Sequence, residues 1–234
     1  MKLITSKIHF DLKTLIKKNF SLVKDLIKEQ NKRINHVNIY HRDWEKQNCN
    51  DEITILKNEY NIDTDRLISL GFITSQVNCF DQYFHIDYNG TTETYFIPLI
   101  NLDDLNGTEY VEFNDESLNI NIVDKLIEIT DLYNNRKDVE EELTKMGISK
   151  SEYEIKILNA NKWGMVHMPY YLFHRGQSNK GIKDRTMFQI VLATKPTANV
   201  SNQVKINDSE LDDDSDIINK LLISRSINEK KLNK

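Results

Sequence analysis

The stretch of the chain that decides the fold is QYFHIDYNGTTETYFIPLINLDDLNGTEYVEF, residues 82–113. Three short runs in it alternate apolar or aromatic side chains with polar ones, at 82–85, 94–102 and 108–113. Asn-Gly pairs lie between these runs, at 89–90 and 106–107. Asn-Gly is a strong signal for a tight turn between two strands. The pattern therefore predicts a meander of short antiparallel strands, as in a barrel or jelly roll.

The rest of the chain adds further strands and two helical regions. Other runs with a strand pattern are 72–80, 154–158, 163–168, 171–174 and 185–192. An amphipathic pattern at 11–33 predicts a helix, and a short helix is expected at 63–70, before Gly71. A second helical region, at about 121–147, interrupts the strands. We expect an α+β protein whose core is a barrel or jelly roll, with flanking N-terminal helices and a helical insertion.

These elements predict a single domain at 1–196, followed by a polar C-terminal tail at 197–234 that lacks an apolar pattern. Within the domain, we expect a helical N-terminal support at 1–70 and a β core at 72–192.

The composition limits the classes of function. The chain has 234 residues and a net charge of −5, which gives no support to a general nucleic-acid-binding role. Cys49 and Cys79 do not form a CxxC or a Cys/His cluster, so zinc-finger and redox motifs are excluded. We see no signal-peptide pattern and no run of the ~20 apolar residues that a membrane span needs. A cytoplasmic protein with no membrane association is expected, and the oligomeric state is left open.

A candidate metal site combines the His85-Ile86-Asp87 triplet with the distant His174. Side chains at positions i and i+2 of an extended chain point to the same side, so His85 and Asp87 can reach one ion. Two imidazoles and one carboxylate can occupy one face of an octahedral iron(II) and leave the other face open. His174 would then come from a neighbouring strand.

Other histidines offer alternatives to this set. His41-Arg42-Asp43 is a second His-x-Asp triplet, but no strand pattern surrounds it and a surface role is favoured. His167 could replace His174, although an apolar strand context favours an ordinary core histidine. His9 and His36 receive no role.

Arg185 is the candidate for an anion-binding residue. It begins the last strong strand, and a polar turn at 176–181 separates it from His174. We expect the strand of Arg185 to run back beside that of His174, with Arg185, Met187 and Gln189 on one face. An arginine that points into a core needs an anionic partner, and a bound dicarboxylate can supply it. A structural salt bridge is the alternative.

These residues carry a resemblance to a known family. From Phe84 to Leu192, the chain resembles the double-stranded β-helix core, a cupin-like jelly roll, of the iron(II)/2-oxoglutarate-dependent dioxygenases. The resemblance therefore implies this fold for the β core. The triplet at 85–87 resembles the His-x-Asp strand end of that family, and 174–185 resembles its distal histidine and 2-oxoglutarate-binding arginine. The segment 95–111 resembles the hairpin that follows in the phytanoyl-CoA-hydroxylase-like and prolyl-hydroxylase-like branches.

The chain departs from patterns of individual branches at two places and keeps the family's carboxylate at a third. Residues 114–117 are Asn-Asp-Glu-Ser, where the phytanoyl branch often has a Pro-Gly-Ser-His type of sequence. Val191 stands where nucleic-acid demethylases usually carry a second arginine, which disfavours nucleobase repair. Asp87 is present, which disfavours the halogenase variant because that variant lacks the carboxylate.

The resemblance implies an enzyme and its cofactors. His85, Asp87 and His174 would bind Fe(II), and Arg185 would bind the distal carboxylate of 2-oxoglutarate. Further contacts to 2-oxoglutarate are expected from Tyr83, which is in phase with His85, and from Gln76 and Asn78, which share a face of the predicted strand 72–80. With dioxygen, such an enzyme hydroxylates a small molecule or an amino-acid or peptide side chain, which the sequence does not identify. The helical insertion at 121–147 would then form a lid or a wall of the substrate site.

Two alternatives stay open. A cupin-like protein could bind a metal or a carboxylate without 2-oxoglutarate turnover. A cupin enzyme could use a metal but no 2-oxoglutarate.

Overall fold

The computed structural model describes residues 2–4, 8–31, 36–40 and 50–194. Residues Met1–Lys195 form one compact unit. The expected tail at 197–234, the second His-x-Asp triplet at 41–43 and Cys49 lie outside the described residues. Cys79 is a buried free thiol.

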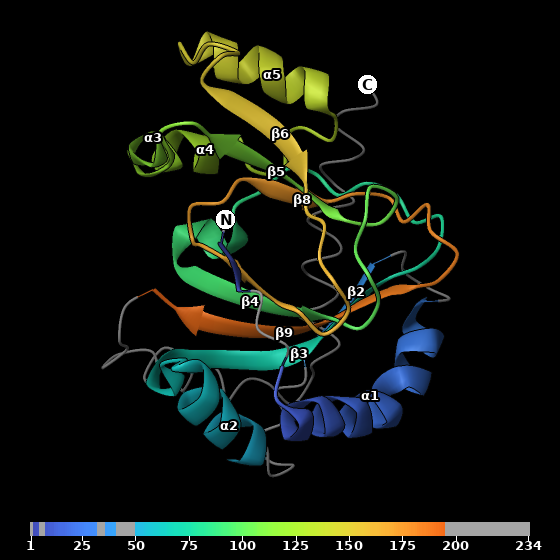
Figure 1. Cartoon of the computed structure of the whole chain (residues 1–234). Helices are drawn as coiled ribbons and strands as arrows, with labels where there is room; N and C mark the ends of the chain where they lie inside the picture. Colours follow the sequence, from blue (N-terminus) through green and yellow to red (C-terminus); the bar gives the residue numbers. More distant parts are fainter. Residues whose placement is uncertain (1, 5–7, 32–35, 41–49, 195–234) are drawn as a thin grey trace, which may run out of the picture. The chain divides into compact units, whose positions relative to one another are not determined.

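The strands form two antiparallel sheets, which lie one above the other in Figure 1. The larger sheet has the order β1-β7-β4-β9-β3-β2 and the smaller has the order β6-β5-β8. The strands are β1 (Lys2–Ile4), β2 (His36–Tyr40), β3 (Leu67–Ser75), β4 (Thr92–Pro98), β5 (Thr108–Phe113), β6 (Tyr153–Ile157), β7 (Met165–Met168), β8 (His174–Gly176) and β9 (Arg185–Ala193). A mixed fold of helices and antiparallel strands, as expected, is therefore present.

The strands do not form the meander that was predicted. β4 pairs with β7 and β9, whereas β5 pairs with β6 and β8, so the segment 95–111 crosses between the sheets and is not a hairpin. The strand of Arg185 also lies in the other sheet from β8, not beside it. Alternation of apolar residues identifies the buried face of a strand but not its partner, which explains both errors.

Two helices cover the outer face of the larger sheet (Figure 1). They are α1 (Phe10–Asn31) and α2 (Asn50–Tyr60). Leu12, Ile16 and Leu56 are fully buried and belong to one apolar cluster with Phe72 of β3 and Phe188 of β9. The first 70 residues thus contribute helices, as expected, but also β1, β2 and the start of β3.

The helical insertion covers the outer face of the smaller sheet. It consists of α3 (Glu116–Asn121), α4 (Val123–Glu128) and α5 (Arg136–Lys145) (Figure 1). Leu126, Val139 and Leu143 are fully buried and share a cluster with Val111 of β5 and with Phe84. A layer that is buried against the back of a sheet favours a support over the expected lid.

A third apolar cluster includes inward-facing residues of both sheets. Phe96 of β4 and Met187 of β9 belong to it together with Tyr110 of β5. β9 is buried along its whole length, and its faces alternate as predicted: Met187 joins this cluster, whereas Phe188 joins the cluster beneath α1 and α2.

Three local predictions are wrong because turns interrupt the patterns. At 63–70 only the 3-10 turn η2 (Thr64–Arg66) forms, with Asp63 as its N-cap, and β3 begins at Leu67. β3 ends at Ser75 rather than near residue 80, and Asn78 then has a left-handed φ of 62°. Residues 82–85 are not a regular strand, since only His85 makes a bridge, to His174.

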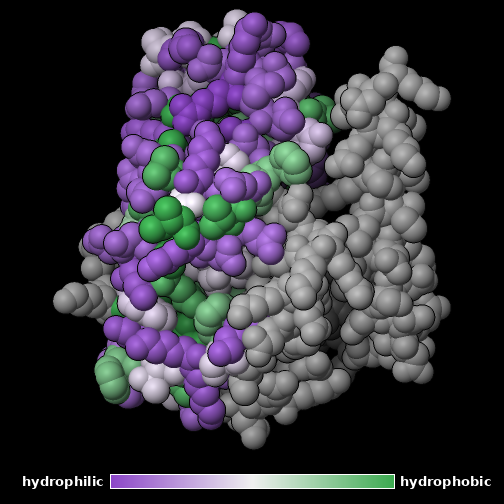
Figure 2. All heavy atoms as spheres, turned by 90° about the vertical axis from the view of Figure 1, so that its right-hand side faces the viewer, coloured by the Kyte–Doolittle hydropathy of each residue, from purple (hydrophilic) through white to green (hydrophobic). Residues whose placement is uncertain are grey.

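Loops meet at the end of the sheets that faces right in Figure 1. Val77 makes a bridge with Asn179, and Lys180 N donates to Leu105 O at 2.8 Å. Figure 2 looks onto this side, where apolar side chains lie among a larger number of hydrophilic ones. No helix of the described residues is long and apolar enough to cross a membrane.

Candidate metal centre

His85 and His174 lie directly opposite each other on two antiparallel segments. The His85 N–H donates to His174 O at 2.7 Å, and the His174 N–H donates to His85 O at 2.9 Å. The centroids of the two imidazoles are 4.5 Å apart. The pairing of backbones thus brings together two residues that are far apart in the sequence.

Asp87 completes a three-residue cluster. It begins the turn η3 (Asp87–Gly90). Its Oδ1 lies 3.5 Å from His85 Nε2 and 3.9 Å from His174 Nε2. All three donor atoms lie within 4.8 Å of one another. Thr94 Oγ1 donates to the other carboxylate oxygen, Oδ2, at 3.3 Å, and so orients Asp87 from the inner face of β4.

Both imidazoles are held in the orientation that a metal ligand needs. His85 Nδ1 lies 2.9 Å from Tyr83 O, and His174 Nδ1 lies 2.9 Å from Leu172 O. A carbonyl oxygen only accepts hydrogen bonds, so in both rings Nδ1 carries the proton and, in the neutral ring, Nε2 carries the lone pair. Metal-ligating histidines usually have this outer partner.

The charge states of the cluster also suit a cation. Burial, together with the neighbouring His85, lowers the pKa of His174 to about 4, so this ring is neutral at pH 7. Burial would raise the pKa of Asp87, but the two histidines outweigh it and lower that pKa to about 2. Burial opposes protonation of His85, yet Asp87 raises the pKa of His85. An ionised carboxylate and a neutral imidazole are the states that bind metal ions.

Two imidazole nitrogens and one carboxylate oxygen favour a first-row transition metal. This donor set, with other coordination positions left open, is characteristic of non-heme iron(II) oxygenases. Calcium and magnesium prefer sites made of oxygen atoms, and structural zinc sites usually supply four protein ligands. The residues present therefore fit Fe(II).

Arg185 lies at the start of β9 and is only 2% exposed. Its Nη1 donates to Asn106 O at 2.7 Å and to Gly107 O at 3.0 Å, and its Nη2 donates to Ser75 Oγ at 2.7 Å. Its Nε is buried without a partner, and no carboxylate of the described residues pairs with it. Burial lowers the pKa of Arg185 to about 10, so at neutral pH the guanidinium keeps its charge.

The guanidinium lies close to the strand that carries His174. A Cβ placed on Gly176 would be 2.9 Å from Arg185 Nη2 and 2.6 Å from Gln82 Oε1. Gly176 is two residues after His174, which corresponds to roughly 7 Å along a strand. The buried guanidinium of Arg185, which has no anionic partner among the described residues, therefore lies close to the cluster of His85, Asp87 and His174.

The other expected contacts are placed less favourably. Tyr83 is half-buried, and its backbone carbonyl orients His85. Gln76 is half-buried and Asn78 is exposed. Because β3 ends at Ser75, the argument that Gln76 and Asn78 share one strand face is wrong. His167, the alternative ligand, bonds to Glu93 at 3.1 Å and stacks on Tyr95 instead.

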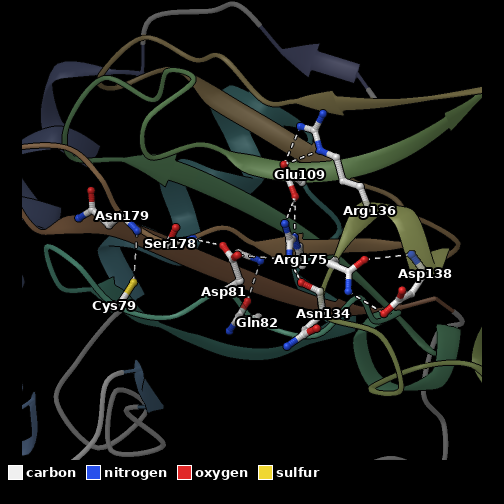
Figure 3. A network of polar contacts seen from close by, with 12 residues as sticks. Cys79, Asp81, Gln82, Glu109, Asn134, Arg136, Asp138, Arg175, Ser178 and Asn179 are labelled. Atoms are coloured by element: carbon white, nitrogen blue, oxygen red, sulfur yellow. Dashed lines mark hydrogen bonds and ion pairs between the residues drawn. The ribbon is translucent and has the colours of Figure 1, made fainter. Parts of the chain in front are cut away.

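Figure 3 shows an ionic network centred on the buried Glu109 and Arg175, with the exposed Arg136 at its edge. Arg175, which follows His174, donates to Glu109 from Nε at 2.5 Å and to Asn134 O, and it lies over the Phe84 ring at 4.9 Å. Arg136 of α5 donates to the other oxygen of Glu109 at 2.6 Å. The network ties the residues next to His85 and His174 to the helical insertion.

Several site residues were missed by sequence reasoning. Thr94, Ser75 and the carbonyls of Asn106 and Gly107 contact Asp87 or Arg185. Thr94 could have been found, since the strand predicted at 94–102, the first after Asp87, begins with it. The contacts of Asn106 and Gly107 with Arg185 could not have been predicted, because they are made by backbone carbonyls, which every residue has.

The chain thus combines an α+β fold of two antiparallel sheets with a cluster of two histidines and one aspartate. No protein-family model and no curated protein sequence matches the chain. Its structure is similar to that of HygX from Streptomyces hygroscopicus with nickel and 2-oxoglutarate bound, with a TM-score of 0.53, 9% identity and coverage of 84% of this chain and 82% of HygX. It is also similar to AviO1 from Streptomyces viridochromogenes Tue57, with a TM-score of 0.51, 13% identity and coverage of 82% and 88%. These similarities show a shared fold.

Proposed function

We propose that this chain is an Fe(II)- and 2-oxoglutarate-dependent oxygenase that hydroxylates a small molecule or an amino-acid or peptide side chain. The observation that carries the proposal is the cluster of His85, Asp87 and His174, together with Arg185 close to it. Either feature has ordinary structural explanations by itself. Together they fit one ligand. Such a ligand would bind a metal held by the two histidines and Asp87, and would supply the anionic partner that the buried Arg185 lacks.

Each residue has a definite part in the proposed reaction. His85, Asp87 and His174 hold Fe(II), which, when bound, supplies the oxidising chemistry with dioxygen and 2-oxoglutarate. Arg185 binds the distal carboxylate of 2-oxoglutarate, and the unpaired Nε contributes to that charge-assisted contact. Thr94 keeps the carboxylate of Asp87 turned toward the two imidazoles.

The two sheets are proposed to be the halves of a double-stranded β-helix. The crossing of β4 and β5 into different sheets supports this, since a jelly roll is built from strands that alternate between two sheets. The shared fold with HygX, a structure with nickel and 2-oxoglutarate bound, supports a divalent metal and 2-oxoglutarate as the proposed cofactors. A phytanoyl-CoA-hydroxylase-like or prolyl-hydroxylase-like branch remains our proposal from the sequence.

Succinate formation tests the proposal. The protein is incubated with Fe(II), ascorbate, 2-oxoglutarate and dioxygen, and succinate is measured beside 2-oxoglutarate binding. We expect succinate from the wild type and none from Asp87→Ala or Arg185→Met. A wild-type protein that binds Fe(II), but neither binds 2-oxoglutarate nor forms succinate, would instead be a cupin-like metal-binding protein or an enzyme with another cosubstrate.

A further inference from the structure

The inward face of β9 carries a row of four side chains: Arg185, Met187, Gln189 and Val191. The register with β4 fixes this row, because Met187 lies opposite Pro98, Gln189 opposite Phe96 and Val191 opposite Thr94. Phe96 and Met187 belong to the same apolar cluster as Tyr110 of the smaller sheet. Gln189 therefore faces the space between the sheets.

Gln189 is buried without a hydrogen-bond partner. It is 5% exposed, and within the described ranges no protein group bonds to its side-chain amide. Other buried amides of the chain are satisfied: Gln177 donates to Asp104 O at 3.1 Å, and Asn179 donates to Ser75 O at 3.0 Å. Neither amide atom of Gln189 is among the fully buried side-chain atoms that lack a partner, so the amide keeps some accessible surface, where a group from outside the chain can bond to it.

The position of Gln189 indicates what that partner is. One end of the row is Arg185, whose Nε is also unpaired. Near the other end, Val191 lies beside Thr94, which holds Asp87 of the metal cluster. Gln189 lies between these ends and diagonally across from Thr94, within reach of a long side chain. A ligand that contacts both Arg185 and a metal held by His85, Asp87 and His174 would therefore lie beside Gln189.

We propose that Gln189 is a binding residue for the 2-oxo acid: its amide N–H donates to an oxygen at the metal-proximal end, while Arg185 binds the distal carboxylate. This rests on the proposed function and deepens it. Gln189 and Arg185 then recognise different parts of the cosubstrate, so their contributions are separable. An acid without a distal carboxylate depends on Gln189 and the metal, and not on Arg185.

Calorimetric titrations of the Fe(II)-loaded protein under nitrogen, with 2-oxoglutarate and with pyruvate, test this. Pyruvate is a 2-oxo acid that lacks the distal carboxylate. For Gln189→Leu we expect both acids to bind roughly 10- to 100-fold more weakly, since one charge-assisted hydrogen bond is lost. Gln189→Glu places a carboxylate at the same point and should weaken both further. Arg185→Met should weaken 2-oxoglutarate and leave pyruvate unchanged.

Metal affinity and thermal melting are measured on each variant. Gln177→Leu is the matched control, because it removes a buried amide that already has a partner in Asp104, and it should leave pyruvate binding unchanged. If Gln189→Leu does not fold, Gln189→Glu decides, since it has nearly the same shape.

Two failures can be told apart. Variants of Gln189 that hold Fe(II) and bind both acids like the wild type would overturn this assignment and leave the proposed function standing; the amide would then face another ligand. A wild-type protein that binds Fe(II) but neither acid would overturn both.

Discussion

At the scale of the residue, the rings of His85 and His174 make matching polar contacts. Each ring donates from Nδ1 to the carbonyl two residues earlier, at 2.9 Å, and each presents Nε2 to Asp87. Two imidazoles prepared in this way, beside one ionised carboxylate, form a site that needs little rearrangement to accept a cation.

Substitution of His174 by Ala should abolish high-affinity metal binding. One of three protein ligands is lost, so the affinity for Fe(II) or Ni(II) should fall by more than the roughly 10- to 100-fold that loss of an outer partner costs. Calorimetry under nitrogen measures this. His167→Ala is the control, since His167 bonds to Glu93 and should leave metal affinity unchanged. Equal affinities of the two variants would contradict the assigned ligand set.

Substitution of Thr94 by Val should have a smaller effect of the same kind. It removes the hydroxyl that donates to Asp87 Oδ2 at 3.3 Å and keeps the shape of the side chain. We expect roughly 10-fold weaker metal binding with little change in stability. Unchanged affinity in the same titration would show that Asp87 needs no help in orientation.

At the scale of the element, the Asn106-Gly107 turn supports Arg185. It was predicted as a hairpin turn, but it leads from one sheet to the other and presents two carbonyls to the guanidinium. Gly107 is required by close approach: a Cβ there would lie 2.5 Å from Leu158 O and 2.9 Å from Asp103 O. The backbone of this turn therefore cannot move without moving the partners of Arg185.

Gly107→Ala should weaken 2-oxoglutarate binding and leave metal binding intact. The added methyl displaces the two carbonyls, and we expect a loss of stability of about 1–3 kcal/mol from overpacking. Gly147→Ala is the control, because its φ of 84° strains an alanine but leaves open space around it. Both variants should melt earlier, and only Gly107→Ala should bind 2-oxoglutarate more weakly. Loss of affinity in both would point to general destabilisation.

Glu109→Gln should destabilise the layer formed by the helical insertion and the smaller sheet. Glu109 is 5% exposed and pairs with both Arg175 and Arg136. Removing one partner from a buried pair typically costs about 3–5 kcal/mol. Urea unfolding measures this, with Glu112→Gln as the control, since that glutamate is 37% exposed and should cost less than about 1 kcal/mol. Similar losses would contradict the role given to the network.

The site residues could be predicted from the sequence more reliably than the pairing of the strands. His85, Asp87, His174 and Arg185 could be nominated because few residue types bind metals or carboxylates, and the structure brings them close together. Asn78 was misplaced because a turn after Ser75 ends the strand, and a period-two pattern does not register a single left-handed residue. Gln189 could be placed on a face, but its lack of a partner is visible only when the opposite strand is known.

At the scale of the whole molecule, the two helical layers lie on the outer faces of the sheets (Figure 1). The candidate site joins the sheets, because His174 belongs to the smaller sheet and Thr94, which bonds to Asp87, belongs to the larger one. The residues of the proposed site come from both sheets: Arg185 from the larger sheet and His174 from the smaller. A ligand that bridges Arg185 and the metal would therefore link the two sheets and bind only the folded protein. Such a ligand should also raise the melting temperature.

The most direct test of the central claim is whether 2-oxoglutarate binding depends on the metal. 2-Oxoglutarate is titrated under nitrogen into the metal-free and the Fe(II)-loaded protein, and into Fe(II)-treated His174→Ala. We expect tight binding to the loaded wild type, and weak binding both to the metal-free protein and to the variant. Equal binding with and without Fe(II), or no binding to a protein that demonstrably holds Fe(II), would contradict the claim.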